Sequence, residues 1–430
     1  MEHCKLQIGC LIIVSYIAFN YYKGCREVPK KHKIKIFDVL LWLGMVSLTF
    51  DGITAYTVNR LEQTPEWFNG FAHTIFLGSV DALIFTTFIY MLKLAEKYPK
   101  NKKIAMLLYV PFVISIAILI FNIDTLDYCK GTVTNYSMGV SVYSCFVMVG
   151  ICIAFTLVTF FRGWNNIERH KRASITIYLL VLLGVSIYQF IVPEALLTSI
   201  GFTTIVIGIY LNQENPTIQE LSEYHQEMVT GLATLVEKRD DNTGGHIRRT
   251  SKYVELLAKE LRDKGYYRNI LTKDYIKNLK MAAPMHDIGK VSVPDAILQK
   301  PGKLTDEEFE IMKQHAKNGG KIIKETFKNI ENIEYTEMAY QVATYHHEKW
   351  NGKGYPTGLK ETEIPLCARI MAVADVFDAV SEKRCYRDAM PMEECFHIIE
   401  EGSGRDFEPL IAEVFLGMKD KVIKAHDSIK

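Results

Sequence analysis

The first half of the chain alternates long apolar stretches with short polar gaps, and this pattern constrains the fold more than any other feature. Seven stretches are apolar enough and long enough to cross a bilayer as helices of about 20 residues. They cover residues 6–22, 34–58, 71–94, 103–122, 138–161, 173–192 and 195–212. Backbone polar groups must be paired inside lipid, so the pattern predicts a seven-helix transmembrane bundle over residues 1–214. The first stretch could instead be a signal peptide, but a basic cluster and no small-residue cleavage site follow Tyr22.

Lysine and arginine alternate between the loops that join these stretches. Basic residues gather after the first, third and fifth stretches, whereas the loops after the second, fourth and sixth carry at most one. Because basic residues concentrate on the cytoplasmic side, the alternation predicts an external N-terminus. An odd number of spans then places everything after residue 214 in the cytoplasm. We expect a multi-pass protein of a bacterial cytoplasmic (inner) membrane, in contact with membrane lipid.

Two ionisable residues, Asp51 and Asp81, lie within the apolar stretches. An ionisable group at membrane depth is costly and usually faces the bundle interior or a wet cavity. These aspartates could line a ligand or proton site, or could form hydrogen bonds between helices. The formal net charge of +1 gives no sign of a nucleic-acid polymer as partner. The nine cysteines form no C-x-x-C pair, so neither a disulfide framework nor a zinc knuckle is indicated.

A linker helix is expected over residues 215–235. Asn215-Pro216 ends the last apolar stretch, because proline cannot continue a helix from within. Beyond it a heptad seam runs through Ile218, Leu221, His225, Met228, Leu232 and Leu235. The seam could form a parallel coiled coil that makes the protein a homodimer, or it could pack on its own domain.

Seven side chains in the second half of the chain could serve as metal ligands. They are five histidines and two aspartates in segments expected to be helical: His246, His286, Asp287, His315, His346, His347 and Asp375. Asp375 lies in an apolar segment, where a metal would offset the cost of burying its carboxylate. Imidazole and carboxylate ligation without thiolate suits iron or manganese, and is compatible with zinc or nickel. The inventory is sufficient for two divalent transition-metal ions bridged by Asp287, a centre that suits phosphodiester hydrolysis.

Residues from about 235 to 415 resemble an HD-GYP domain, the helical cyclic di-GMP phosphodiesterase branch of the HD hydrolase superfamily. The matching motifs follow one another in the family's order. They are Arg239-Asp240, Thr243–His246, His286–Lys290, Val293–Asp295, Lys300–Gly302, His315, His346–Glu348, Gly352–Pro356, Ile364-Pro365, Arg369, Asp375–Asp378 and Phe407–Pro409. The resemblance implies an all-α metallohydrolase domain over residues 236–430 that hydrolyses cyclic di-GMP to the linear dinucleotide or GMP.

The same resemblance implies roles for individual residues. One metal site would consist of His246, His286, Asp287 and Asp375, and Asp287 would bridge to a second site with His315, His346 and His347. Asp287 and Lys290 would act in catalysis, with Lys290 meeting the scissile phosphate. Gly354, Tyr355 and Pro356 would form a substrate loop, and Arg369 would contact the substrate or a metal-ligating carboxylate.

Two positions depart from the family pattern. Members with a third metal carry a glutamate where this chain has Asn242, so we expect two metals. Glu408 replaces the usual aspartate and changes its reach by one methylene. Two alternative functions are hydrolysis of another cyclic dinucleotide, and a catalytically silent receptor for cyclic di-GMP. Loss of a ligand would favour the silent receptor, and no ligand is lost.

Overall fold

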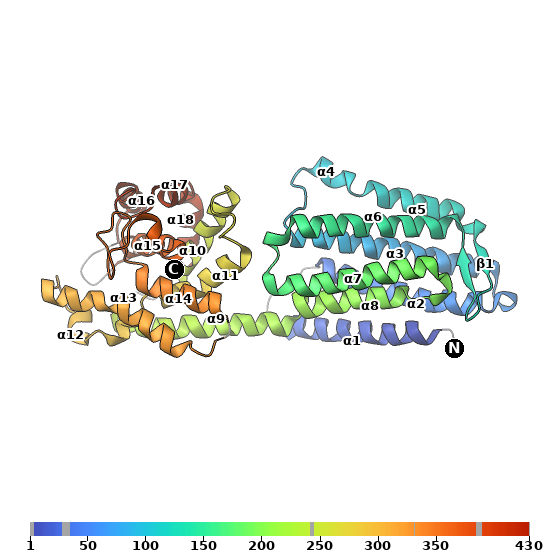
Figure 1. Ribbon diagram of the computed structural model, residues 1–430, viewed down its shortest axis with the longest axis horizontal. Coiled ribbons are helices and arrows are strands. Elements are labelled where there is room, and N and C mark those ends of the chain that lie inside the picture. Colours follow the sequence, from blue (N-terminus) through green and yellow to red (C-terminus); the bar gives the residue numbers. More distant parts are fainter. Residues whose placement is uncertain (1–3, 28–34, 241–244, 331, 384–388, 430) are drawn as a thin grey trace. The chain divides into compact units, whose positions relative to one another are not determined.

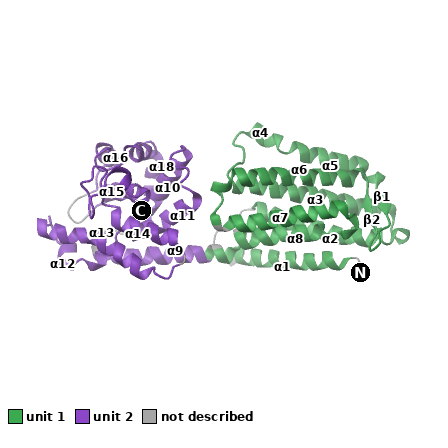
Figure 2. Ribbon diagram, viewed as in Figure 1, with its two compact units in different colours: residues 1–220 green, residues 221–430 purple. Residues whose placement is uncertain are grey.

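The computed structural model describes residues 4–27, 35–240, 245–330, 332–383 and 389–429 (Figure 1). Within these ranges the chain is almost entirely helical, which confirms the predicted all-α class. One short antiparallel hairpin pairs β1 (Asp127–Cys129) with β2 (Tyr136–Met138). The chain divides into two compact units, Met1–Glu220 and Leu221–Lys430 (Figure 2).

Unit 1 is a bundle of apolar helices. Its α-helices are α1 (Lys5–Glu27), α2 (Ile36–Val58), α3 (Glu66–Leu94), α4 (Lys102–Leu107), α5 (Val110–Asn122), α6 (Val140–Arg162), α7 (Arg169–Ile191) and α8 (Thr198–Ile209). Among the described residues, six helical segments are long and apolar enough to cross a membrane: Lys5–Cys25, Ile36–Val58, Glu66–Leu94, Lys102–Thr125, Val140–Arg162 and Lys171–Ile191.

The prediction of seven spans differs from this finding at α8. The stretch 195–212 was expected to form one helix, but η5 (Pro193–Ala195) precedes it and Leu196 has a φ of 49°. This left-handed residue interrupts the helix, because a non-glycine side chain rarely continues a helix from there. As a result α8 has only 12 residues and continues as a π-helical segment, η6 (Tyr210–Glu214).

Asp51 and Asp81 are both buried in unit 1 and both accept hydrogen bonds from serines of other helices. Asp51 of α2 accepts one from the hydroxyl of Ser199 in α8. Asp81 of α3 accepts one from the hydroxyl of Ser115 in α5, at 2.5 Å. Of the two roles considered for these aspartates, hydrogen bonding between helices is therefore present at each.

Unit 2 packs helices around one hydrophobic core. Its α-helices are α9 (Pro216–Glu237, which begins in unit 1), α10 (His246–Asp263), α11 (Lys273–Ala282), α12 (Asp295–Leu298), α13 (Asp306–Thr326), α14 (Ile333–Tyr345), α15 (Leu366–Ser381), α16 (Met392–Glu401), α17 (Pro409–Leu416) and α18 (Lys419–Asp427). Leu257 of α10, Phe377 of α15 and Phe415 of α17 are fully buried. Each such side chain contributes about 1.5–3 kcal/mol through burial, which holds α10 and α15 in place.

The linker helix α9 has two apolar faces. Val229 and Ala233 are buried, whereas the predicted heptad seam is solvent-exposed. Leu221, Met228 and Leu235 of this seam are each more than 60% exposed. The seam therefore does not pack on its own domain, which was one of the two alternatives.

Candidate metal centre

His286 and Asp287 lie in a turn between two 3-10 segments, η8 (Ala283–Met285) and η9 (Ile288–Ser292). A Cβ atom at Gly289 would stand 1.9 Å from the carbonyl oxygen of His315. Only glycine therefore permits η9 to lie so close to α13. This close approach brings Asp287 to the histidine on α13.

The expectation that all seven donors lie on helices is wrong for four of them. His286 and Asp287 occupy the turn described above, and His346 and His347 follow Tyr345, the last residue of α14. His246 is the first residue of α10, as expected, and His315 and Asp375 lie within α13 and α15. Turns let adjacent residues such as His346 and His347 face one centre, whereas neighbours in a helix point about 100° apart.

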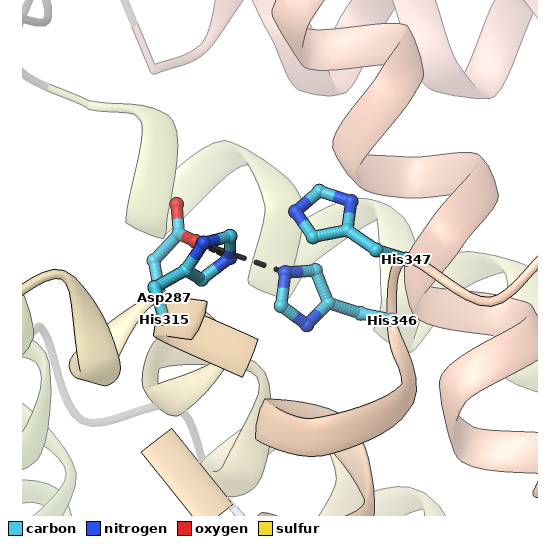
Figure 3. Close-up of side chains that lie close together, drawn as sticks. All are labelled: Asp287, His315, His346 and His347. Carbon is cyan, nitrogen blue, oxygen red and sulfur yellow. Dashed lines mark ion pairs between the residues drawn. The ribbon is translucent and has the colours of Figure 1, made fainter. Parts of the chain in front are cut away.

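Four of the predicted ligands form one group around a carboxylate oxygen. Asp287, His315, His346 and His347 offer ligand atoms that lie within 4.8 Å of one another (Figure 3). The Nε2 atoms of His315 and His346 are 3.3 and 3.7 Å from Oδ1 of Asp287. Both Nε2 atoms are buried, and neither has a hydrogen-bond partner among the residues that the structure describes. Two unpaired buried nitrogens facing one carboxylate oxygen are what a metal site requires.

A second group lies on the other side of Asp287. His246 and His286 offer ligand atoms within 4.8 Å of those of Asp287. Nε2 of His286 is 3.4 Å from Oδ2 of Asp287, and Oδ1 of Asp375 is 3.5 Å from Nε2 of His246 and 3.7 Å from Nε2 of His286. The two oxygens of Asp287 thus face different groups of histidines. The structure brings all seven predicted ligands together, and their binding of metal remains a prediction.

Hydrogen bonds to Nδ1 orient these imidazoles. Nδ1 of His286, His315 and His346 each contacts a backbone carbonyl, at 2.9, 2.7 and 2.9 Å. A carbonyl oxygen can only accept, so Nδ1 carries a proton, and in the neutral ring Nε2 keeps its lone pair. This is the tautomer that metal binding through Nε2 needs.

Asp378 orients the remaining histidine of the second group. Its Oδ2 lies 2.8 Å from Nδ1 of His246, and its Oδ1 accepts a hydrogen bond of 2.7 Å from Nε of Arg249. Asp378 and Arg249 are almost completely buried. The sequence analysis matched Asp378 to a family motif and gave it no role. The sequence signal that could have predicted this role is the position of Asp378 one helical turn after Asp375.

Electrostatics favour the protonation states that ligands require at His347, His315 and Asp287, and oppose the neutral state at His286. Burial lowers the pKa of His347 well below its usual range and that of His315 to about 4, so both imidazoles are neutral at pH 7. Burial would raise the pKa of Asp287, but Lys290 and His286 hold it well below its usual range. Burial would lower the pKa of His286, but Asp287 and Asp375 raise it to about 9. Metal loading should therefore release a proton from His286.

The predicted substrate residues Lys290 and Tyr355 adjoin this cluster. Nζ of Lys290 is 2.8 Å from Oδ2 of Asp287. The Tyr355 ring lies over His347, with centroids 4.7 Å apart. A Cβ atom at Gly354 would stand 2.3 Å from the backbone nitrogen of Lys349, so this loop needs glycine there.

Glu348 fixes the loop on its other side. Its Oε1 accepts hydrogen bonds from the backbone nitrogen and the hydroxyl of Thr357, at 2.8 and 2.7 Å. It also accepts one of 3.1 Å from the backbone nitrogen of Gly358. The buried carboxylate next to His347 thus ties the loop of Gly354, Tyr355 and Pro356 to the ligand pair.

Arg369 forms an ion pair with Glu408, and its expected contact with substrate stays a prediction. Its Nη1 donates a hydrogen bond of 2.6 Å to Oε2 of Glu408, and the hydroxyl of Tyr267 donates to Oε1 of the same residue. No contact between Arg369 and a predicted metal ligand is found among the described residues. The alternative that Arg369 contacts a ligating carboxylate is therefore not seen. Glu408, the departure from the family's aspartate, is buried and forms both bonds.

Glu237, at the end of α9, is a further candidate that the sequence analysis missed. It is buried, and neither carboxylate oxygen has a hydrogen-bond partner among the described residues. Burial raises its pKa, and the charges of His246, His286 and Lys290 oppose that rise. Asn242, on which the expectation of two metals depends, lies outside the described residues.

Known proteins match the unit that holds this cluster. Residues 230–411 match the family described as HD domain. A cyclic di-GMP phosphodiesterase of Vibrio cholerae is 39% identical over 224 residues, which cover 52% of this chain and 46% of the relative. A probable cyclic di-GMP phosphodiesterase of the same organism is 45% identical over 199 residues, 46% of this chain and 45% of the relative. A 3'3'-cGAMP-specific phosphodiesterase 2, also from Vibrio cholerae, is 39% identical over 223 residues, 52% of this chain and 40% of the relative.

The second unit is therefore an HD domain, and the motifs that it carries are those of the HD-GYP branch. The chain spans about half the length of the curated relatives that it matches. The matched residues are those of the second unit and the end of its linker helix.

Proposed function

We propose that this protein is a membrane-anchored, metal-dependent phosphodiesterase that hydrolyses cyclic di-GMP. The two-sided placement of Asp287 carries the proposal: Oδ1 faces His315 and His346, and Oδ2 faces His286 and Lys290. One carboxylate between two sets of imidazoles matches a binuclear centre. The relatives named above act on cyclic dinucleotides, which supports the substrate class.

Two divalent transition-metal ions, iron or manganese by the chemistry of the donors, would supply the positive charge that activates water and neutralises the phosphoryl oxygens. The protein's own part is to hold the donors in place. Carbonyl contacts keep a proton on Nδ1 of His286, His315 and His346, so that Nε2 is the atom that would bind a metal, and Asp378 does the same for His246.

The remaining site residues would bind and position the substrate. Lys290 carries a positive charge next to Asp287, where it can meet a phosphate oxygen as a point charge. Tyr355 offers an aromatic face beside His347 on which a guanine base can stack. Because Arg369 pairs with Glu408, its proposed part in substrate binding is the least supported of the set.

The test is cleavage of cyclic di-GMP by the purified full chain, loaded with manganese or, anaerobically, with iron. His346→Ala and Asp287→Ala should each lower turnover by orders of magnitude while the far-UV spectrum stays helical. His397→Ala, at an exposed histidine of α16, is the matched control and should leave turnover unchanged. More than about a tenth of wild-type turnover in either ligand variant would refute the binuclear mechanism.

Elemental analysis tests the number of metals independently of activity. The seven donors support two ions per chain, so the anaerobically purified protein should hold two. Three ions would show that a further carboxylate takes the place left by Asn242, and the partnerless Glu237 is the first to examine.

Another cyclic dinucleotide is the second candidate substrate, because one of the relatives is named for 3'3'-cGAMP. Parallel assays of cyclic di-GMP, 3'3'-cGAMP and cyclic di-AMP separate the two candidates. The linear dinucleotide and GMP are distinguished in the same assays as products.

We also propose that α9 forms a parallel homodimer through its exposed seam. The seam leaves Leu221, Met228, Leu232 and Leu235 in solvent, a stripe that an identical helix would cover. Met228→Glu, in the middle of the seam, should yield monomers in light scattering of the detergent-purified chain. An exposed charge change off the seam, Glu223→Lys, is the control.

A further inference from the structure

Unit 1 encloses a cavity of about 120 Å³. Side chains of α2, α3, α6, α7 and α8 form its walls, and residues 135–138, which include β2, form part of its lining. The hairpin lies at the same end of the bundle as the N-terminus (Figure 2). An engineered cavity of about 150 Å³ accommodates benzene, so this smaller cavity suits an apolar body no larger than a single six-membered ring.

Most of the lining is apolar, including Phe76, Val80, Val149 and Phe202. Asp51 adds a buried carboxylate, and no lysine or arginine is among the described residues that line the cavity. A carboxylate in an apolar cavity is costly unless a cation or several donors compensate it. Ser199 supplies one hydrogen bond to Asp51 and brings no charge.

Three of the polar side chains that line the cavity, Gln189, Asn135 and Thr54, are engaged inside the protein, and the hydroxyls of Tyr136, Ser137, Ser186 and Thr198 line it as well. Nε2 of Gln189 donates to the carbonyl of Pro193 at 2.7 Å, and its Oε1 accepts from the backbone nitrogen of Leu197 at 2.6 Å. The side-chain nitrogen of Asn135 donates to the carbonyl of Val58, and the hydroxyl of Thr54 donates to the carbonyl of Asp51.

The lining also offers hydrogen-bond acceptors, on His73 and Asp51. Nδ1 of His73 lies 2.8 Å from the carbonyl of Asn69, so Nδ1 carries the proton and Nε2 of the neutral ring is an acceptor. Asp51 still offers lone pairs beyond its bond with Ser199. The cavity thus combines an apolar wall, a buried carboxyl group and an imidazole acceptor.

We infer that this cavity is a binding site for a small primary amine with an apolar body, whose ammonium group pairs with Asp51. The amine brings the positive charge that no described lining residue supplies, and its hydrocarbon part matches the apolar wall of the cavity. Anionic ligands are excluded because they would meet Asp51 without a compensating cation. The site belongs to unit 1 alone, so it stands independently of the proposed phosphodiesterase activity.

The test measures ligand-dependent thermal stabilisation of the full chain in detergent. Benzylamine is the probe, and benzyl alcohol and benzoate are matched in size but neutral and anionic. We expect saturable stabilisation by benzylamine, at least about tenfold weaker binding of the alcohol, and none of benzoate. Equal affinity for amine and alcohol, or no binding of benzylamine, would overturn the inference.

Variants locate the binding. Asp51→Asn keeps the shape and an acceptor for Ser199, and should weaken benzylamine binding at least about tenfold. Asp81→Asn is the matched control, because Asp81 is equally buried and does not line the cavity. If Asp51→Asn fails to fold, Val149→Phe decides the matter, since it fills the cavity and keeps the carboxylate. Unchanged benzylamine affinity in Val149→Phe, or an equal loss in Asp81→Asn, would place the amine elsewhere.

Discussion

Replacing Asp378 by asparagine should disable one side of the metal cluster without removing a ligand. Nε of Arg249 donates to Oδ1 of Asp378 at 2.7 Å, its Nη2 donates to Oδ2 at 3.1 Å, and Nδ1 of His246 lies 2.8 Å from Oδ2. In Asp378→Asn the shorter bond from Nε keeps the amide oxygen in the place of Oδ1, so the amide nitrogen replaces Oδ2, loses the bond from Nη2 and donates to Nδ1 of His246. The imidazole proton then moves to Nε2, where no lone pair is left for a metal.

The magnitude follows from this change of tautomer. Loss of a residue that orients a metal-binding histidine costs about 10–100-fold in metal affinity, or about 1.4–2.7 kcal/mol. The fold should lose about 1.5–3 kcal/mol in addition, because a charged hydrogen bond between buried groups becomes a weaker one. Arg249 keeps a second partner, Glu382, with Nη2 3.5 Å from its Oε2.

The assay is metal content after equilibration with graded concentrations of a chelator. The wild type should release its ions in a narrow range, whereas Asp378→Asn should lose one ion per chain at about 10–100-fold lower chelator strength. Glu382→Gln is the matched control, because it alters a carboxylate beside the same arginine without touching His246. Wild-type metal retention in Asp378→Asn would refute the orientation argument.

Three further predictions concern topology, coupling and pH. A reporter inserted after Lys100 should read as cytoplasmic and one after Lys130 as external, because basic residues concentrate before the first site and not around the second; the reverse would invert the proposed orientation. Two residues inserted between positions 219 and 220 turn the following helix by about 200°, whereas four turn it by about 400°, close to a whole turn. Activity in membranes should therefore survive four residues far better than two, and equal activity would make α9 a passive tether. Glu255 is surrounded by lysines that outweigh its burial and lower its pKa to about 2. Its charge therefore stabilises the fold above the unfolded pKa of about 4.3, and this contribution is lost as the pH falls towards 2. Glu255→Gln should cost about 1 kcal/mol in urea unfolding at pH 7, and a difference that persists at pH 2 would contradict this reasoning.

The sequence was sufficient to predict that seven donors converge, because their residue types have little other use together. His246, His315 and Asp375 lie on helices of unit 2, and the other four donors lie in turns next to helical segments. His246 was expected to open a helix, and α10 begins at this residue. The fold class followed for the same reason, since helical periodicity and apolar length carry over directly into helices.

The details that could not be predicted depend on close approach between segments far apart in the sequence. The turn at His286 depends on the close approach of Gly289 to α13. No pattern within the segment predicts this contact. Leu196, with its left-handed φ, shortens the helix that hydropathy alone extends to residue 195. The partners of Arg369 could not be inferred either, because Glu408 is 39 residues away along the chain.

The four donors that were wrongly expected on helices are the two adjacent pairs of the metal cluster. A helix would present only one of two adjacent side chains to a given neighbour, whereas both His286 and Asp287, and both His346 and His347, must face the same centre. Non-helical turns therefore appear at the pairs on which convergence depends, and the chain offsets their cost with glycine and carbonyl hydrogen bonds to imidazole. The preference of a segment for helix and the arrangement that a site needs can conflict where a protein positions its functional groups. At His286 and Asp287, Pro284 also favours the break in the helix, because proline cannot continue a helix from within.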